Sequence, residues 1–251
     1  MARRLKLANP LQLNGKASAR LGSSSMESCY MCELPASSRE HAPPRCIFPE
    51  PKDLEDGSNL RKNLITVPSC DQHNPRFSKD DEYFLVMTTL NIDGNELKTR
   101  HFATKVIRAL RRSPAFADNT LAEKLPFTLV DGRPAMGFSI ERRRIERVVE
   151  KTARAIHYHS TNGRKLFAPL QIHLPNLRYA DGKSAEGMEQ LLLLAEELTK
   201  GEPWLGDNPE VFRYRVRLDP TDRASFQWMV FYDGFTALVV WGTGVETEQA
   251  G

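Results

Sequence analysis

The sequence contains no apolar run long enough to cross a membrane. Its longest such run, residues 235–241, has the length of a strand, whereas a membrane-spanning helix needs about 18 or more apolar residues. Residues 1–26 also lack the apolar segment of a secretory signal peptide. With 40% apolar and 27% charged residues over 251 positions, we expect a soluble, cytoplasmic protein of one or two domains.

A large excess of charge of one sign is also missing. The formal net charge is only +3, so any surface that binds nucleic acid must be local rather than a property of the whole chain. Residues 1–26 carry five basic and no acidic residues, and we expect them to form a disordered arm. Arg213, Arg215 and Arg217, the arginine stripe, alternate with apolar residues and are candidates for contact with nucleic-acid phosphates. A solvated sheet face is the alternative interpretation of the stripe.

Cysteine is scarce, and four residues in 251 exclude a disulfide-dense scaffold and favour a reducing compartment. Three of the four nevertheless have the spacing of metal ligands. Cys29 and Cys32 form a C-x-x-C pair, and Cys70 forms a C-x-x-H pair with His73. Two such pairs supply the four ligands of a tetrahedral structural zinc ion. Cys46 is left over as an ordinary thiol, although it could replace His73 as the fourth ligand.

Four polar residues near these pairs are not needed to hold zinc: Glu40, His41, Asn63 and Asn74. Hydrolysis of a phosphodiester needs a base whose pKa is near neutral, and histidine supplies one. It also benefits from a hard divalent cation, and oxygen ligands such as Glu40 and Asn74 suit Mg²⁺ or Mn²⁺. Taken singly, a structural histidine and turn-capping asparagines explain these residues equally well. Taken together, they predict a hydrolytic site beside a zinc site.

The combined pattern resembles the HNH endonucleases of the ββα-metal fold. The resemblance covers about residues 29–83, a fifth of the chain, through C-x-x-C, E-H-x-x-P, N-L-I-x-V-P-x-C-x-x-H-N and S-K-D-D-E-Y. It implies that His41 is the general base and that Glu40 is the acidic metal ligand. It also implies that Asn63 is the central asparagine of the motif and that Asn74 is a metal ligand carried by the helix.

Two positions depart from the usual HNH pattern. Glu40 stands where many members have aspartate, and the second zinc pair is Cys70 with His73 instead of two cysteines. The resemblance implies a metal-dependent endonuclease that acts on DNA, and an association with bacterial defence or restriction. The alternative is a zinc-stabilised nucleic-acid-binding or regulatory module whose nuclease site is inactive.

We therefore predict an α+β protein with a zinc-stapled ββα-metal domain over residues 27–92, an α+β companion domain over 93–245 and a tail over 246–251. In the zinc domain we expect strands near residues 39–42 and 64–67, followed by a helix that starts at Cys70 and carries Asn74. For the companion domain we leave three roles open: DNA binding, dimerisation, or the sensing of a signal.

Periodicity predicts three helices and an antiparallel sheet in the companion domain. Apolar residues recur at helical spacing over residues 98–112, 140–159 and 185–199. Alternation of apolar and polar residues, together with a hairpin signal at Asp233-Gly234, predicts strands over residues 211–218, 225–232 and 235–241. Residues 165–174 are a further candidate strand, and residues 116–137 have the composition of a loop.

Overall fold

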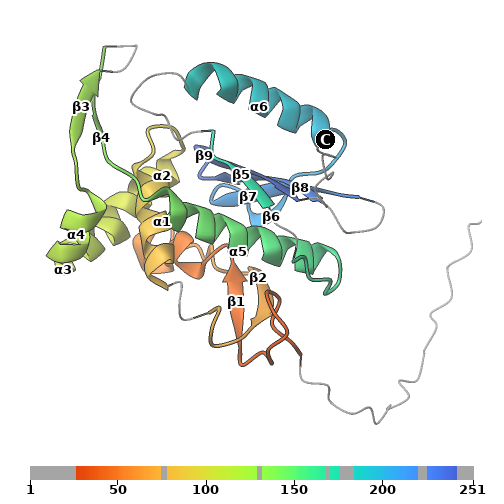
Figure 1. Ribbon diagram of the computed structural model, residues 1–251. Coiled ribbons are helices and arrows are strands. Elements are labelled where there is room, and N and C mark those ends of the chain that lie inside the picture. Colours follow the sequence, from red (N-terminus) through yellow and green to blue (C-terminus); the bar gives the residue numbers. More distant parts are fainter. Residues whose placement is uncertain are drawn as a thin grey trace, which may run out of the picture.

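A five-stranded antiparallel sheet lies at the centre of the molecule, in the strand order β5-β9-β8-β7-β6 (Figure 1). The computed structural model describes residues 27–74, 78–128, 132–167, 170–175, 184–219 and 225–241, so the predicted arm and tail lie outside it. The strands are β5 (Leu170–His173), β6 (Leu205–Asn208), β7 (Phe212–Leu218), β8 (Ser225–Phe231) and β9 (Phe235–Trp241). The predicted α+β class and the strands β7, β8 and β9 are confirmed.

Strand β6 was not predicted, because its sequence LGDN contains none of the β-branched or aromatic residues that favour strands. Its pairing with β7 is irregular, with a register shift between Leu205 and Asn208. Tertiary position therefore imposes the extended conformation on this segment. Within the described residues, no helix is long and apolar enough to span a membrane.

Helices cover both faces of the sheet (Figure 1). On one face lie α1 (Ser78–Leu90) and α5 (Arg142–Ser160), and on the other lies α6 (Ser184–Leu198). The predicted helices at 140–159 and 185–199 are confirmed as α5 and α6. The predicted helix at 98–112 is present as α2 (Glu96–His101), a π-helical turn (Phe102–Val106) and α3 (Ile107–Arg112), followed by α4 (Pro114–Thr120).

The segment 116–137 is more regular than its composition indicated. Besides part of α4 it contains β3 (Leu125–Thr128) and β4 (Pro134–Gly137), which pair as a separate antiparallel ribbon. These strands were not predicted because they contain Pro126 and Pro134, and proline lacks the N–H group that a central strand uses. Such a two-stranded ribbon accepts proline on its edges.

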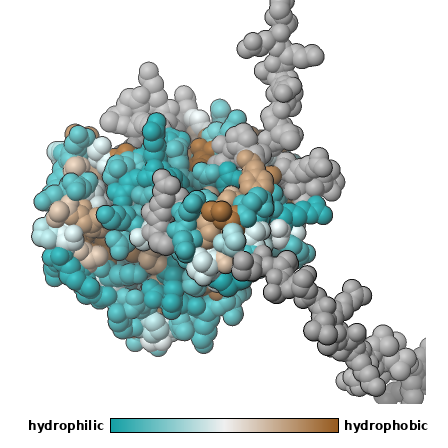
Figure 2. All heavy atoms as spheres, turned by 60° about the horizontal axis from the view of Figure 1, so that its bottom comes forward, coloured by the Kyte–Doolittle hydropathy of each residue, from teal (hydrophilic) through white to brown (hydrophobic). Residues whose placement is uncertain are grey.

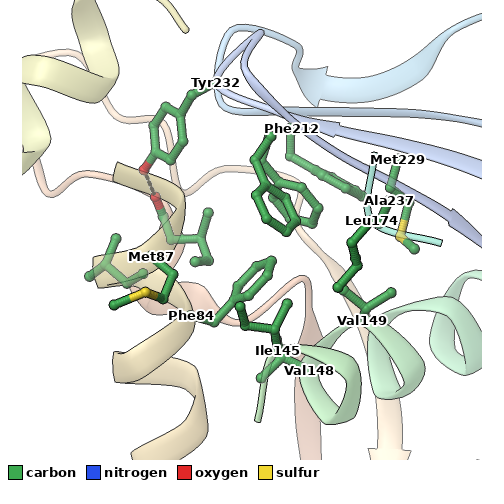
Figure 3. Close-up of a cluster of buried hydrophobic side chains, with 14 of the residues drawn as sticks. Phe84, Met87, Ile145, Val148, Val149, Leu174, Phe212, Met229, Tyr232 and Ala237 are labelled. Atoms are coloured by element: carbon green, nitrogen blue, oxygen red, sulfur yellow. Dashed lines mark hydrogen bonds between the residues drawn. The ribbon is translucent and has the colours of Figure 1, made fainter. Parts of the chain in front are cut away.

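One hydrophobic core joins α1, α5 and the sheet (Figure 3). The ring of Phe84 in α1 packs edge-on against Phe231, at 5.1 Å between ring centroids, and against Phe235, at 5.5 Å. Ile47 belongs to the same buried cluster and its carbonyl accepts a hydrogen bond from the hydroxyl of Tyr232. The cluster therefore takes residues from both sides of the domain boundary that we predicted at residue 92.

A small hairpin of β1 (Ser38–Ala42) and β2 (Ile65–Ser69) lies at the end of the molecule opposite α6 (Figure 1). Two 3-10 turns, Arg45–Ile47 and Pro51–Asp53, lie in the connection between the strands. Helix α5 packs against both strands of the hairpin, whereas α1 packs against α5. The predicted strands are confirmed, but the helix that covers them comes from far along the chain.

The helix that we predicted to begin at Cys70 begins later. The chain forms a tight turn after β2, in which the N–H groups of His73 and Asn74 donate to the carbonyl of Cys70 at 3.0 and 3.1 Å. Helix α1 starts at Ser78. Asn74 therefore lies in the turn and not on the helix, because the turn is needed to bring the side chains of Cys70 and His73 together.

Candidate metal centre and hydrolytic site

Cys29, Cys32, Cys70 and His73 form a Cys3His cluster at the end of the β1–β2 hairpin. One ligand atom from each residue lies within 4.8 Å of all the others. The first pair occupies the turn that precedes β1, and the second pair directly follows β2. Since β1 and β2 are antiparallel neighbours, the start of one strand lies beside the end of the other, and the two pairs meet.

The distances within the Cys3His cluster fit a tetrahedral zinc ion bound through Nδ1 of the histidine. The Sγ atoms of Cys32 and Cys70 are 3.7 Å apart. Nδ1 of His73 lies 3.5, 3.5 and 3.3 Å from Sγ of Cys29, Cys32 and Cys70. Zinc bonds of about 2.3 Å to sulfur and about 2.0–2.1 Å to nitrogen imply tetrahedral edges of about 3.8 Å and about 3.6 Å. The donor set and its spacing are those of a structural zinc site.

Backbone contacts hold the first pair of ligands in place. The N–H of Tyr30 donates to the carbonyl of Pro68 at 2.9 Å, which ties the turn to β2. The N–H of Met31 points at Sγ of Cys29 from 3.4 Å, a contact that would stabilise a metal-bound thiolate. This part of the site is therefore preformed by the hairpin.

Cys46 is not part of the cluster. Its thiol donates to the carbonyl of Asp81 at 3.5 Å, and burial raises the pKa of the Cys46 thiol to about 12. The ligand atoms that lie within 4.8 Å of one another include that of His73 and not that of Cys46. The candidate fourth ligand is accordingly His73 and not Cys46.

His41 lies on the outward face of the hairpin. Successive residues of a strand point to opposite faces, and in β1 Glu40 and Ala42 are buried, while Arg39 is exposed and His41 half-buried. His41 is paired with Thr66 of β2. Partial burial lowers the pKa of His41 below its usual value of 6.5, and the positive charges of Arg45 and Arg61 lower it further.

Arg45 and Arg61 were missed by the sequence analysis. They come from the long connection between β1 and β2, where the motif that resembles HNH nucleases prescribes no residue. Arg61 is held by the carbonyl of Phe48 at 2.9 Å and by Glu50 at 3.2 Å, whereas Arg45 is exposed. Arg45 could have been found from the sequence, because it is a basic residue only four positions after His41.

Glu40 points into the protein, away from His41. One carboxylate oxygen accepts a hydrogen bond from Nζ of Lys151 at 2.6 Å, and the other lies 3.4 Å from the hydroxyl of Tyr30. Lys151 of α5 also pairs with Asp81 of α1 at 2.6 Å. Because Glu40 and Lys151 are both almost fully buried, this ion pair joins the hairpin to two helices of the main core.

The ion pair between Glu40 and Lys151 yields a stability prediction. Lys151→Met leaves two carboxylates without their cation in a buried place, so we expect a loss of about 3–5 kcal/mol in the free energy of unfolding, measured by urea denaturation. The triple variant with Glu40→Gln and Asp81→Asn should recover part of that loss, since no buried charge remains unpaired. Lys200→Met, at a side chain that is 74% exposed, is the matched control and should change the stability by less than about 1 kcal/mol. A similarly small change for Lys151→Met would contradict a role of this pair in stability.

The two asparagines lie beside different ends of the hairpin. Asn63 precedes β2 with a left-handed backbone, φ 54°, which asparagine adopts more readily than most residues. Asn74 donates from its side-chain amide to Oγ of Ser38 at 2.9 Å and to the carbonyl of Arg39 at 3.5 Å. The structure thus does not bring all four predicted catalytic residues together: His41 faces outward, and Glu40 faces the core.

A cleft of about 1060 Å³ adjoins the outward face of the hairpin. Residues of the hairpin contribute to the wall of the cleft. Among them, Arg39 lies on the same face as His41, and Thr66 is the strand partner of His41. The end of α5, the segment 202–207 and β7 complete the cleft, with the lining residues Asn63, Leu64, Ile65, His159, Ser160, Glu202, Pro203, Leu205, Gly206, Asp207, Tyr214, Val216 and Leu218. Its charge is mixed, with the cation of Arg39 and carboxylates of Glu202 and Asp207.

The arginine stripe faces α6, and each of its residues has a partner within the chain. Arg213 forms an ion pair with Asp233, and its guanidinium lies 5.1 Å from the ring centroid of Trp204. Arg215 lies 4.6 Å from the same ring and forms an ion pair with Glu196 of α6 at 3.0 Å.

Arg217 completes this pattern by donating to the carbonyl of Leu198, at the end of α6, at 3.0 Å. Each of the three guanidinium groups therefore already has a partner within the protein, although Nε of Arg213 and Nε of Arg215 make no hydrogen bond. The geometry gives the arginine stripe a structural function: Arg215 and Arg217 hold α6 on the sheet, and Arg213 ties β7 to Asp233. Binding of nucleic acid by these residues stays a prediction.

No known protein family matches this chain, and no curated protein or solved structure is significantly similar to it. The function must therefore be argued from the geometry of the site and from the motif in the sequence. Two features carry that argument: the zinc-fitting cluster at one end of the hairpin, and His41 with its neighbouring arginines on the outward face of the hairpin.

Proposed function

We propose that this protein is an endonuclease that hydrolyses phosphodiester bonds, with DNA as its substrate and His41 as its general base. The observation that carries the proposal is the position of His41. It is half-buried on the outward face of the hairpin that carries the Cys3His cluster, near Arg45 and Arg61, and Arg39 and Thr66 of the same face line the cleft. A rigid base next to cationic side chains is what the attack of water on a phosphodiester requires.

The roles of the side chains follow from their charges. The lowered pKa of His41 favours the neutral imidazole, which is the form that accepts a proton from the attacking water. Arg45 is exposed and binds the scissile phosphate, since a guanidinium can donate two hydrogen bonds to phosphate oxygens. Arg61 is held by Glu50 and by a carbonyl, and adds positive charge without moving.

The described geometry does not fit the divalent metal site that the HNH resemblance implies. Both oxygens of Glu40 face partners in the interior, Lys151 and Tyr30. Asn74 lies in the turn after β2, where its amide nitrogen donates to the first residues of β1, so only its amide oxygen could face a metal and Glu40 could not join it. We therefore assign no ligand and no reaction step to Mg²⁺ or Mn²⁺, and the dependence of activity on a divalent ion is left to measurement.

The position of Glu40 also favours the second function, a zinc-stabilised module that binds nucleic acid without cleaving it. A carboxylate locked to Lys151 is what such a module would retain as a purely structural residue. The two functions predict different results for wild-type protein, because only an endonuclease produces new strand breaks.

Nicking of supercoiled plasmid DNA separates the two functions. We expect wild-type protein to convert the plasmid to open circles, in parallel reactions with Mg²⁺, with Mn²⁺ and without added metal. Omission of the divalent ion is preferable to a chelator, which would also remove zinc. Binding of labelled DNA without nicking under any of the three conditions would favour the non-catalytic module.

The charge near His41 predicts a pH dependence. A general base works in its deprotonated form, so kcat/KM rises with pH up to the pKa of His41 and is level above it. That pKa lies below 6.5 because of burial and the charges of Arg45 and Arg61. Arg45→Gln removes one of these charges, so the acid limb of the profile should move to higher pH. Arg111→Gln, on the exposed surface of α3, is the control, and an unmoved limb in Arg45→Gln would argue against His41 as the base.

A further inference from the structure

The β3–β4 ribbon exposes apolar side chains on both of its faces. Its register places Leu125 and Phe127 on one face and Met136 on the other, and these side chains are 56%, 42% and 47% exposed. All residues of β3 are exposed, and neither strand contains a charged residue. The ring of Phe127 leans over Gly137, at 3.6 Å from where a Cβ would be, so the ribbon packs mainly on itself.

Such a ribbon is not expected to be stable in water by itself. An isolated two-stranded hairpin is marginal, and three strands or a packed helix are usually needed for stability. A contiguous exposed apolar patch larger than a few hundred Å² marks an interaction surface, whereas single exposed apolar residues do not. A partner that covers the ribbon would both stabilise it and turn its apolar side chains into part of such a patch.

Helix α6 presents a second apolar surface. Leu193, Leu194 and Leu198 are 65%, 53% and 37% exposed. Ala195 is buried, and Leu198, three residues later, lies at the edge of that packed side. Figure 1 shows both the ribbon and α6 at the end of the molecule away from the β1–β2 hairpin. The hairpin end, brought forward in Figure 2, is mostly hydrophilic and has only separate apolar spots.

We propose that the protein forms a two-fold dimer in which the ribbon of each copy covers α6 of the other. The partner surface must be largely apolar, because the strands themselves are uncharged and charge next to them comes only from residues such as Lys124 and Arg133 at their starts. The ribbon alone contributes three large apolar side chains, which is too little for the roughly 800 Å² per partner that a stable interface buries. Adding α6 doubles the apolar set, and a two-fold axis covers both surfaces at once.

Two substitutions and their mixture test the proposal by sedimentation equilibrium of the full chain. Wild-type protein should sediment at twice its mass of 28.5 kDa. Phe127→Asp and Leu194→Asp, each at an exposed position, should weaken self-association by about 30-fold or more, since each buries a charge in the interface. An equal mixture of the two variants should regain part of the dimer, because one wild-type ribbon can still cover one wild-type α6.

Leu34→Asp is the matched control, since Leu34 is 43% exposed but lies beside the Cys3His cluster at the other end. It should dimerise like wild type. Zinc content and the far-ultraviolet circular dichroism of all variants would show that the fold is intact. Monomeric wild-type protein would overturn the proposal. Dimers that survive both substitutions would overturn it too, and failure of the mixture to recover would exclude the contact between ribbon and α6.

Discussion

His41→Ala is expected to lower the rate of plasmid nicking by about 10²–10⁴-fold, the usual effect of removing a general base. The imidazole faces outward and is not part of the Cys3His cluster. Zinc content, melting temperature and DNA affinity should therefore stay near wild-type values. The rate, the metal content and the melting temperature are to be measured on the same preparation.

A matched histidine substitution makes the test specific. His173→Ala removes a histidine of β5, in the central sheet, and should leave the nicking rate unchanged. Loss of zinc in His41→Ala would identify His41 as a zinc ligand and contradict its catalytic assignment. Full activity with normal zinc content would mean that hydrolysis takes place elsewhere or not at all.

Cys70→Ser should have the largest effect on the fold. Structural zinc sites contribute about 10–16 kcal/mol of apparent binding free energy, more than the total stability of many domains, which is about 5–15 kcal/mol. Losing one thiolate should therefore release zinc and unfold the β1–β2 hairpin. Because α5 packs on that hairpin, we expect a lower melting temperature for the whole protein, together with loss of nicking.

Cys46→Ser is the control for Cys70→Ser, since Cys46 lies outside the cluster. It should retain one zinc ion per chain by elemental analysis, whereas Cys70→Ser should retain none. Wild-type protein that contains no zinc when freshly purified would refute the assignment of the Cys3His cluster. Equal zinc loss in the two variants would point to a general instability instead of a ligand role.

Local patterns in the sequence predicted the elements whose periodicity is strong. Helix α5 is an example: its apolar stripe includes Ile145 and Val148, both fully buried. The C-x-x-C and C-x-x-H spacings predicted the ligand set. The two pairs meet because the end of β2 lies beside the start of the antiparallel strand β1. The β3–β4 ribbon and β6 escaped prediction, since proline, glycine and a shifted register interrupt the alternation that reveals strands.

The candidate site was only partly predictable, for a different reason. Adjacency in the motif suggested that Glu40 and His41 act together, but neighbours in a strand point to opposite faces. The partner that decides the role of Glu40 is Lys151, which lies 111 positions further along the chain. Likewise, the partners of the arginine stripe are Asp233, Trp204 and residues of α6, so nothing local distinguished a structural role from phosphate binding.

The contact between Tyr232 and Ile47 has a consequence for synthesis of the protein on the ribosome. These residues are 185 positions apart, and Phe84 likewise waits for Phe231 and Phe235 to complete its packing. The part of the chain that carries the Cys3His cluster emerges first, but Ile47 and Phe84 are not fully covered until β8 and β9 have been made. Contacts of such long range slow folding, so we expect the nascent chain to expose part of its core until residues 225–241 have left the ribosome.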